Sequence, residues 1–418
     1  MNPRMALPAE MTKIAPMQAH VAFAETLRGA VLAQDFAATP DHAQQGAPVG
    51  VHPSIDLAVV AFPPDEPPRW ANVLFSREHP HGVVAHIGRD AGAVQNIRYL
   101  QDLQGANGES IAWAPGANWA TLPWQPLRGA AAGTGAGTGK GKGGGGGGSG
   151  SADGHPDADA DAAAHRFPAP YPASLLKLMV AVGLGLALDR RLIQAWPAAL
   201  EPMMTVSDNE ATNECVALLH AAGAVTLLNQ RLAELGLSTL QLNNTTPGGG
   251  WRNGDGAGVG HIHMTAWDTV RLLWLLDAAA PPTPWLPFGV RLLSDAARGE
   301  LHAVLRRQKM DEVLSSGSLR QHPGWVRGLP DAPSFAHKTG TTENYAADAG
   351  IVNANGAHYL VAVLTNLGRR YAPIDAPRDV SKGAATDAQA EAGHESCATT
   401  WRLPALGGAL RGLLEHWS

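Results

Sequence analysis

The sequence predicts an α/β (α+β) protein in which one sheet, built from distant parts of the chain, lies beside an all-helical lobe. Strand-like segments occur near both ends of the chain, at 55–62 and within 335–365, and helical segments fill much of the stretch between them. Hydrophobic residues make up 45% and charged residues 16%, as in a globular protein. The longest apolar stretch, 175–188, carries a lysine and is too short to span a bilayer, so we expect no transmembrane segment.

Charge and length limit the kinds of protein that this chain can be. The net charge of −6 is modest, which argues against nucleic-acid partners and against a basic membrane-binding surface. A length of 418 residues allows two or three average domains, or one large α/β domain with insertions. The first 30 residues lack the apolar core of a secretory signal, so no export signal is visible; as written we expect a cytoplasmic chain, and the compartment is unknown.

The N-terminal elements follow from local patterns. Apolar positions at helical spacing predict a helix over 21–33. An apolar run over 55–62, ended by two prolines, predicts a strand. Short strand-like runs follow at 72–76, 82–87 and 110–113, and the sequence leaves their pairing open.

Later segments predict the lobe and the rest of the sheet. Helical periodicity, with glycine or polar residues at the ends, predicts helices over 175–189, 209–222, 225–235, 265–278, 294–307 and 403–417. Apolar runs predict neighbouring strands over 335–338, 349–353 and 358–365.

Composition divides the chain into six regions around a single catalytic domain. The glycine run 143–148 and the Asp/Ala stretch 157–164 cannot bury enough apolar surface to offset the entropy of ordering, which predicts disorder there. The predicted regions are a disordered leader (1–19), an N-terminal helix and strands that contribute to the sheet (20–128), a Gly/Ala/Asp-rich disordered insertion (129–166), the catalytic core (167–371), a loose polar loop (372–398) and a C-terminal helix that packs on the sheet (399–418).

Three short motifs carry the candidate chemistry. They are Ser174-Leu175-Leu176-Lys177, Ser207-Asp208-Asn209 and Lys338-Thr339-Gly340. The first places a hydroxyl and an amine three residues apart on one face of a helical turn, which suits a nucleophilic serine whose proton passes to an amine. Lysine acts as a base only when burial or a nearby cation lowers its pKa, and Lys338 is a candidate for that cation.

The second motif supplies groups for proton transfer and binding. Ser207 is suited to pass a proton to a departing nitrogen, and the Asn209 amide to bind a substrate amide or Lys177. We therefore expect Ser174, Lys177, Ser207, Asn209 and Lys338 to act as one catalytic set.

The third motif and the residue after it suggest a substrate-binding strand. Lys338 is an alternative partner for a substrate carboxylate, with the hydroxyls of Thr339 and Thr341 adding hydrogen bonds. The backbone N–H groups of Ser174 and Thr341 are candidates for the oxyanion hole. Gly340 has no side chain, and we expect this to leave room for substrate beside the strand.

The sequence predicts neither a cofactor nor a metal site. The pairs His79/His81 and His261/His263 have ligand-like spacing, but no third ligand is evident. Surface or helix-capping histidines are the expected interpretation.

In this order, the three motifs are the signature of class A β-lactamases and penicillin-binding proteins, and the chain resembles that family. The likeness covers about 167–370 and includes Tyr171-Pro172-Ala173 before the nucleophile and Gly328-Leu329-Pro330 before the third motif. The resemblance implies an antiparallel sheet flanked by helices, an all-helical lobe, and an active site between them.

The resemblance also implies an activity. It suggests a serine hydrolase that opens β-lactam amides through a Ser174 acyl-enzyme, with a small β-lactam or a peptidoglycan-like peptide as substrate. Two alternatives stay open: a D-alanyl-D-alanine carboxypeptidase, amidase or esterase, and a penicillin-binding or sensor protein that deacylates slowly. Similar proteins are usually periplasmic, so the compartment is open too.

One departure from the family pattern concerns deacylation. Class A enzymes carry a glutamate after the second motif that activates the deacylating water, yet this sequence has no glutamate between Glu234 and Glu300. Asn243 and Asn244 stand in the corresponding stretch, and neither is a base near neutral pH. Asp255 is the nearest carboxylate. We expect acylation to be intact and deacylation to be slow, because losing a general base costs roughly 100- to 10,000-fold in rate.

Overall fold

Six antiparallel strands form the main sheet of the computed structural model, which describes residues 11–100, 119–120, 164–251, 262–320, 325–371 and 401–415. The spatial order is β10-β11-β12-β3-β4-β5. The strands are β3 (Ile55–Ala61), β4 (Arg69–Phe75), β5 (Val83–Val84), β10 (Phe335–Thr341), β11 (Ala346–Ala354) and β12 (Ala357–Thr365). Strand β12 pairs with β3 from Thr365↔Ile55 to Tyr359↔Ala61, so segments about 300 positions apart in the sequence lie side by side. The predicted fold class is confirmed.

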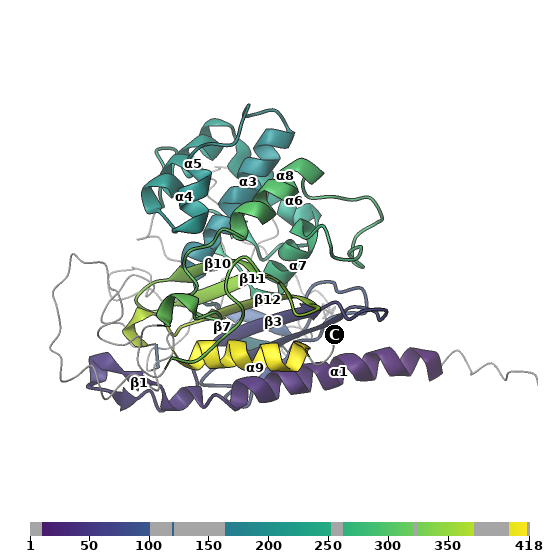
Figure 1. Ribbon diagram of the computed structural model, residues 1–418, viewed down its shortest axis with the longest axis vertical. Coiled ribbons are helices and arrows are strands. Elements are labelled where there is room, and N and C mark those ends of the chain that lie inside the picture. Colours follow the sequence, from purple (N-terminus) through teal and green to yellow (C-terminus); the bar gives the residue numbers. More distant parts are fainter. Residues whose placement is uncertain are drawn as a thin grey trace, which may run out of the picture.

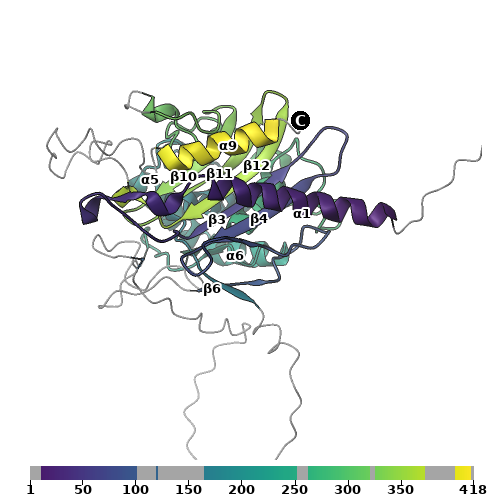
Figure 2. The same ribbon diagram turned by 90° about the horizontal axis from the view of Figure 1, so that it is seen from below.

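Helices cover both faces of this sheet (Figures 1 and 2). The helices are α1 (Met11–Leu32), α3 (Lys177–Asp189), α4 (Leu200–Thr205), α5 (Asn209–Ala221), α6 (Ala224–Glu234), α7 (Ala266–Leu276), α8 (Asp295–Leu305) and α9 (Leu403–Glu415). Helix α1 packs on β4, and α9 lies beside α1 on the same face, against β12. Helix α7 packs on β3 and β12 and separates the sheet from the lobe formed by α3–α6 and α8.

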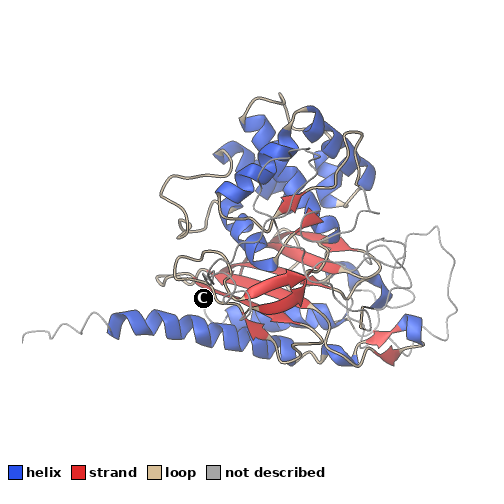
Figure 3. Cartoon of the chain, turned by 180° about the vertical axis from the view of Figure 1, so that it is seen from behind, coloured by secondary structure: helices blue, strands red, loops and turns tan. Residues whose placement is uncertain are grey.

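Short elements complete the described chain. They are η1 (Phe36–Ala38), β1 (Pro40–Asp41), η2 (His42–Gln44), β2 (Ala47–Pro48), β6 (Ile97–Leu100), β7 (His165–Pro168), η4 (Ala173–Leu176), β8 (Gln241–Leu242), β9 (Ile262–His263), η6 (Gly317–Leu319) and η7 (Arg369–Tyr371). Figure 3 shows that the lobe is almost entirely helical, whereas the strands gather below it.

The central helix of the lobe, α3, is buried on nearly all sides, from Lys177 to Ala187. A helix surrounded by protein needs apolar residues all round, and the sequence from Leu178 to Leu188 supplies them. Gly183 contributes to the close packing, because a Cβ there would lie 3.1 Å from a methyl group of Leu219. The first residues of α3 are therefore held in a fixed position at the sheet.

Several boundaries differ from the sequence-based prediction. Helix α1 begins at Met11, so residues 11–19 of the predicted disordered leader are helical. Strand β7 begins at His165, inside the predicted insertion, and pairs in parallel with β6, which we did not predict. Helix α4 was also missed, because six residues that include a proline give little periodicity. The run 110–113, most of the insertion, and the loop 372–398 lie outside the described residues.

No helix in the described ranges is long and apolar enough by itself to cross a membrane. Helices α5 and α6 satisfy that criterion only as a pair, with a bend of 86° between them.

A buried histidine lies on β9, shortly before α7. His263 is 1% exposed, and within the described part of the chain neither ring nitrogen has a hydrogen-bond partner. The ring of Tyr99 packs against it edge-on. Burial lowers the pKa of His263 to about 3. Our expectation of a surface or capping histidine is therefore wrong at this position.

This histidine should make the fold sensitive to acid. Its pKa is lower in the folded state than in the unfolded state, so its contribution is intact above about pH 6.5 and is lost as pH falls toward 3. Replacing His263 with leucine should reduce the stability lost between pH 7 and pH 4 by about 3 kcal/mol. Denaturant unfolding of both proteins at the two pH values measures this difference. The matching substitution at the exposed His81 is the control, and equal losses in all three proteins would contradict the prediction.

Candidate active site

The first motif forms a tight turn at the start of the central helix of the lobe. Ser174 lies on η4 and is partly exposed, whereas Lys177 begins α3 and is 1% exposed. Ala173 has φ of 50°, in the left-handed region that residues with a side chain rarely adopt. Such strained positions persist only where the surroundings enforce them, and they often occur at functional sites.

The second motif meets the lysine of the first. Lys177 Nζ donates hydrogen bonds to Ser207 O (2.5 Å), Ser207 Oγ (3.0 Å) and Asn209 Oδ1 (2.8 Å). Asp208 has a structural reason to be there, because its side chain caps α5 by accepting a hydrogen bond from Ala211 N. Ser207 itself has φ of 58°, which makes it a second left-handed residue in the site.

The third motif reaches the same hydroxyl from the sheet. Lys338 lies on β10, is fully buried, and donates from Nζ to Ser207 Oγ (3.1 Å) and to Thr339 O (2.8 Å). The Ser207 hydroxyl therefore lies between two amines, one from the lobe and one from the sheet.

Both lysine side chains lie where the charged ammonium form is destabilised. Burial lowers the pKa of Lys177 to about 8, and Asp208 opposes that change. Burial and the charge of Lys177 lower the pKa of Lys338 to about 7, against the carboxylates of Asp348 and Glu312. Since two amines that share one hydroxyl titrate as a pair, the pair gives up a proton much nearer neutral pH than an ordinary lysine does.

Gly340 allows β10 to contact the turn that carries Ser174. A Cβ at this position would collide with Pro172 O and would lie 2.5 Å from Leu175 N and 2.7 Å from Ser174 N. The backbone of the turn thus occupies the space that the missing side chain leaves, where we had expected substrate. The same contact holds Ser174 against β10.

The backbone N–H of Thr341 points to the open edge of the sheet. Strand β10 is an edge strand, and the N–H of the next residue, Thr342, bonds to Tyr345 O across the hairpin to β11. Because N–H groups alternate in direction along a strand, that of Thr341 faces away from β11. Thr341 is partly exposed, and Thr339 is buried.

Two residues near the site were missed from the sequence. Arg369, exposed and located after β12, donates to Thr341 Oγ1 at 3.4 Å. Burial raises the pKa of Glu312, while the charges of Arg369 and Lys338 oppose that change. Tertiary contacts bring both residues near β10, Glu312 from the segment after α8 and Arg369 from the segment after β12, so no local pattern could have identified them. Three cationic side chains thus gather in a chain whose net charge is −6.

The loop that follows α6 lies against α5. A Cβ on Gly249 would collide with Asn213 O, one helical turn beyond Asn209. Asn243 Oδ1 accepts a hydrogen bond from Asn229 Nδ2 (2.9 Å), so its amide is tied to α6. Asp255 lies outside the described residues.

Within the ranges that the structure describes, no three His, Cys, Asp or Glu side chains gather in a way that could hold a metal ion.

Comparisons with known proteins point in the same direction as the geometry. Residues 195–386 match the Beta-lactamase enzyme family. No curated protein matches the sequence.

Solved structures that are similar to this chain include PBP-A and two β-lactamases. A structure of PBP-A is 22% identical, with a TM-score of 0.36, and the match covers 59% of this chain and 82% of that one. A β-lactamase from Sphaerobacter thermophilus is 16% identical, with a TM-score of 0.38 and coverage of 59% and 83%. The β-lactamase of Streptomyces albus G is 17% identical, with a TM-score of 0.36 and coverage of 58% and 85%. The match over residues 195–386, together with the three motifs, makes this chain similar to serine hydrolases of the β-lactamase and penicillin-binding protein family.

Proposed function

We propose that the chain forms an acyl-enzyme with β-lactams at Ser174 and hydrolyses them slowly. The observation that carries this proposal is the Ser207 hydroxyl held between Lys177 and Lys338 beside the nucleophile turn. A hydroxyl in that position can carry a proton between the two amines and a departing nitrogen.

Acylation begins when an amine accepts the proton of Ser174. Lys177 is one turn away on the same helical face, and its lowered pKa makes a neutral amine accessible near pH 8. Ser174 Oγ then attacks the lactam carbonyl carbon. The negative charge that develops on the carbonyl oxygen is stabilised by the backbone N–H groups of Ser174 and Thr341, and Asn209 binds the amide side chain of the substrate.

Ring opening needs a proton at the lactam nitrogen. Ser207 donates it and recovers a proton from a neighbouring lysine, so the C–N bond breaks without releasing an amide anion. The substrate carboxylate binds near Lys338, Thr339 and Thr341, and the Arg369 guanidinium adds a cation at the outer edge.

Slow deacylation is the second half of the proposal. The acyl-enzyme needs a base to activate water, and the stretch between Glu234 and Glu300 contains no glutamate. Lys177 remains as the base for both half-reactions. A penicillin-binding or sensor protein that stays acylated is therefore the second candidate function, and a D-alanyl-D-alanine carboxypeptidase is the third.

Incubation with a penicillin, followed by intact-mass measurement, should show one penicillin mass added to the wild-type chain. Ser174→Ala should show none, because the hydroxyl that forms the ester is gone. Release of a chromogenic cephalosporin product, measured in parallel, gives the turnover rate. The control is Ser294→Ala, which removes the cap of α8 instead, and unchanged labelling of the Ser174→Ala protein would refute the assignment of the nucleophile.

Acylation should depend on pH through the lysine pair. Below the pKa values of about 7 and 8 both amines are charged and no base is present, so the acylation rate should fall about tenfold for each unit by which the pH decreases. This low-pH part of the profile is its acid limb, and stopped-flow measurement of acylation between pH 5 and pH 10 records it. Lys309→Met, at an exposed lysine, should leave the limb unchanged. A limb near pH 10.5 would mean an ordinary lysine and would contradict the assignment.

Gly340→Ala should uncouple the strand from the nucleophile turn. The added methyl group collides with the backbone of the turn and must push Ser174 away from β10. Displacements of about 1 Å can cost roughly 100-fold in rate, so acylation per folded molecule should drop by about that factor. Gly299→Ala is the matched control, because a Cβ there meets nothing within 4 Å. Equal acylation rates for the two variants would contradict the proposed role of the contact.

A further inference from the structure

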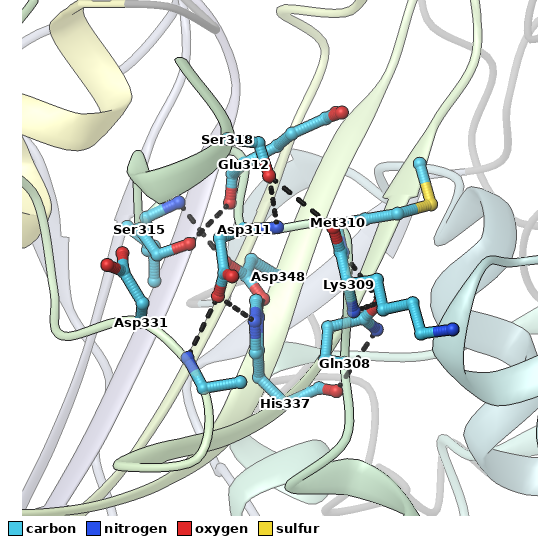
Figure 4. A network of polar contacts seen from close by, with 12 residues as sticks. Gln308, Lys309, Met310, Asp311, Glu312, Ser315, Ser318, Asp331, His337 and Asp348 are labelled. Carbon is cyan, nitrogen blue, oxygen red and sulfur yellow. Dashed lines mark hydrogen bonds and ion pairs between the residues drawn. The ribbon is translucent and has the colours of Figure 1, made fainter. Parts of the chain in front are cut away.

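A short segment behind the site joins the lobe to the sheet. Residues 308–312, here called the connector, follow α8 and run past β10 (Figure 4). Its first residue, Gln308, is 4% exposed. A buried amide needs partners for all its polar atoms, so its contacts indicate what it does.

The Gln308 amide bridges backbone carbonyls that precede two of the motifs. Its Nε2 donates to Met204 O (3.1 Å) and to His337 O (3.3 Å), and its Oε1 accepts from Lys309 N and Met310 N (both 3.0 Å). Met204 lies three residues before Ser207, and His337 directly precedes Lys338. One side chain therefore ties the turn that carries Ser207 to the strand that carries Lys338.

The lobe side of this bridge has a second bond. Lys309 N donates to Thr205 O at 3.0 Å, immediately beside the Met204 bond. The connector thus binds two successive carbonyls at the end of α4. Its position relative to Ser207 is fixed by backbone atoms.

The sheet side is fixed by a buried ion cluster. His337 Nδ1 lies 2.7 Å from Asp348 Oδ1 on β11, and its Nε2 lies 3.3 Å from Asp311 Oδ1 on the connector (Figure 4). Burial lowers the pKa of His337, but the two carboxylates raise it to a net value of about 9, so the ring is charged at neutral pH. Asp348 also accepts from Leu314 N (3.1 Å), just beyond the connector.

The two lysines cannot fix this geometry themselves. Each amine sits at the end of a flexible four-carbon stem and could follow the Ser207 hydroxyl if the turn moved. Gln308 instead joins main-chain atoms through a short, fully hydrogen-bonded amide. Losing it would remove the hydrogen bonds that Gln308 Nε2 donates to Met204 O and His337 O.

We propose that Gln308 is a positioning residue, which sets the separation between the Ser207 turn and the Lys338 strand and thereby aligns the proton path for acylation. This inference deepens the proposed function and rests on it for the activity readout alone.

The test compares the full-length chain with Gln308→Met, which keeps the side-chain length and removes all four hydrogen bonds. Acylation by a penicillin, measured at a temperature where circular dichroism shows both proteins to be folded, should slow by about tenfold or more. A purely structural role would lower the unfolding temperature but leave the acylation rate per folded molecule unchanged.

A second readout needs no substrate. The chain has only seven lysines, so an NMR spectrum of lysines labelled with ¹³C at Cε contains few signals. The titration of each lysine can then be followed while the pH is varied. The charged groups around the pair are Asp208, Glu312 and Asp348. If the turn and the strand separate, mutual repulsion and burial both weaken, and the pKa values of Lys177 and Lys338 should rise by about half a unit or more.

Gln230→Met is the matched control, since Gln230 lies on the exposed face of α6 and bonds only to Glu234 among the contacts described here. It should change neither readout.

If Gln308→Met does not fold, Gln308→Asn replaces it, because the shorter amide keeps its polarity but cannot span both carbonyls. Unchanged acylation together with unchanged lysine titration would overturn the inference. If the wild-type chain is not acylated at all, the proposed function fails, and the lysine titration alone decides the role of Gln308.

Discussion

The site depends on one hydroxyl that accepts hydrogen bonds from two buried amines. Ser207 Oγ lies 3.0 Å from Lys177 Nζ and 3.1 Å from Lys338 Nζ, and these amines come from different halves of the fold. Two ammonium groups so close together repel each other, and burial removes the water that would stabilise them. The arrangement therefore favours loss of a proton, which is what a serine nucleophile needs from its neighbours.

The fold keeps this unfavourable arrangement in place through backbone contacts. The edge strand β10 lies directly against the Ser174 turn at Gly340, and the connector ties β10 to the end of α4. Two residues have left-handed backbone conformations here: Ala173, which directly precedes Ser174, and Ser207 itself. Strain and buried charge thus occur together at one point, whereas the surrounding helices and strands follow ordinary packing rules.

Much of the architecture could be predicted because its elements have strong local patterns. The continuous apolar runs of β3 and β12 identify buried strands, and the ends of α5 and α7 have capping residues at Asp208 and Thr265. The parallel pair β6–β7 could not be predicted, because four-residue strands with mixed burial have no distinctive period. Similarly, the start of α1 at Met11 could not be predicted, because its first residues show no regular helical spacing of apolar positions.

The candidate site divides in the same way. The meeting of its three motifs could be predicted, since each motif holds residue types with a definite chemical use at a fixed spacing. Arg369, Glu312 and Gln308 could not, because each reaches the site through a tertiary contact with no local signature. The reason for Gly340 also changed: its backbone approaches the nucleophile turn, a contact that sequence spacing alone does not reveal.

A crystal structure of the chain after reaction with a penicillin tests the central claim most directly. The account predicts continuous density from Ser174 Oγ to the opened ring, the ester carbonyl oxygen between the N–H groups of Ser174 and Thr341, and Ser207 Oγ still between the two lysine amines. An ester on another residue, or a Lys338 amine far from Ser207, would contradict it.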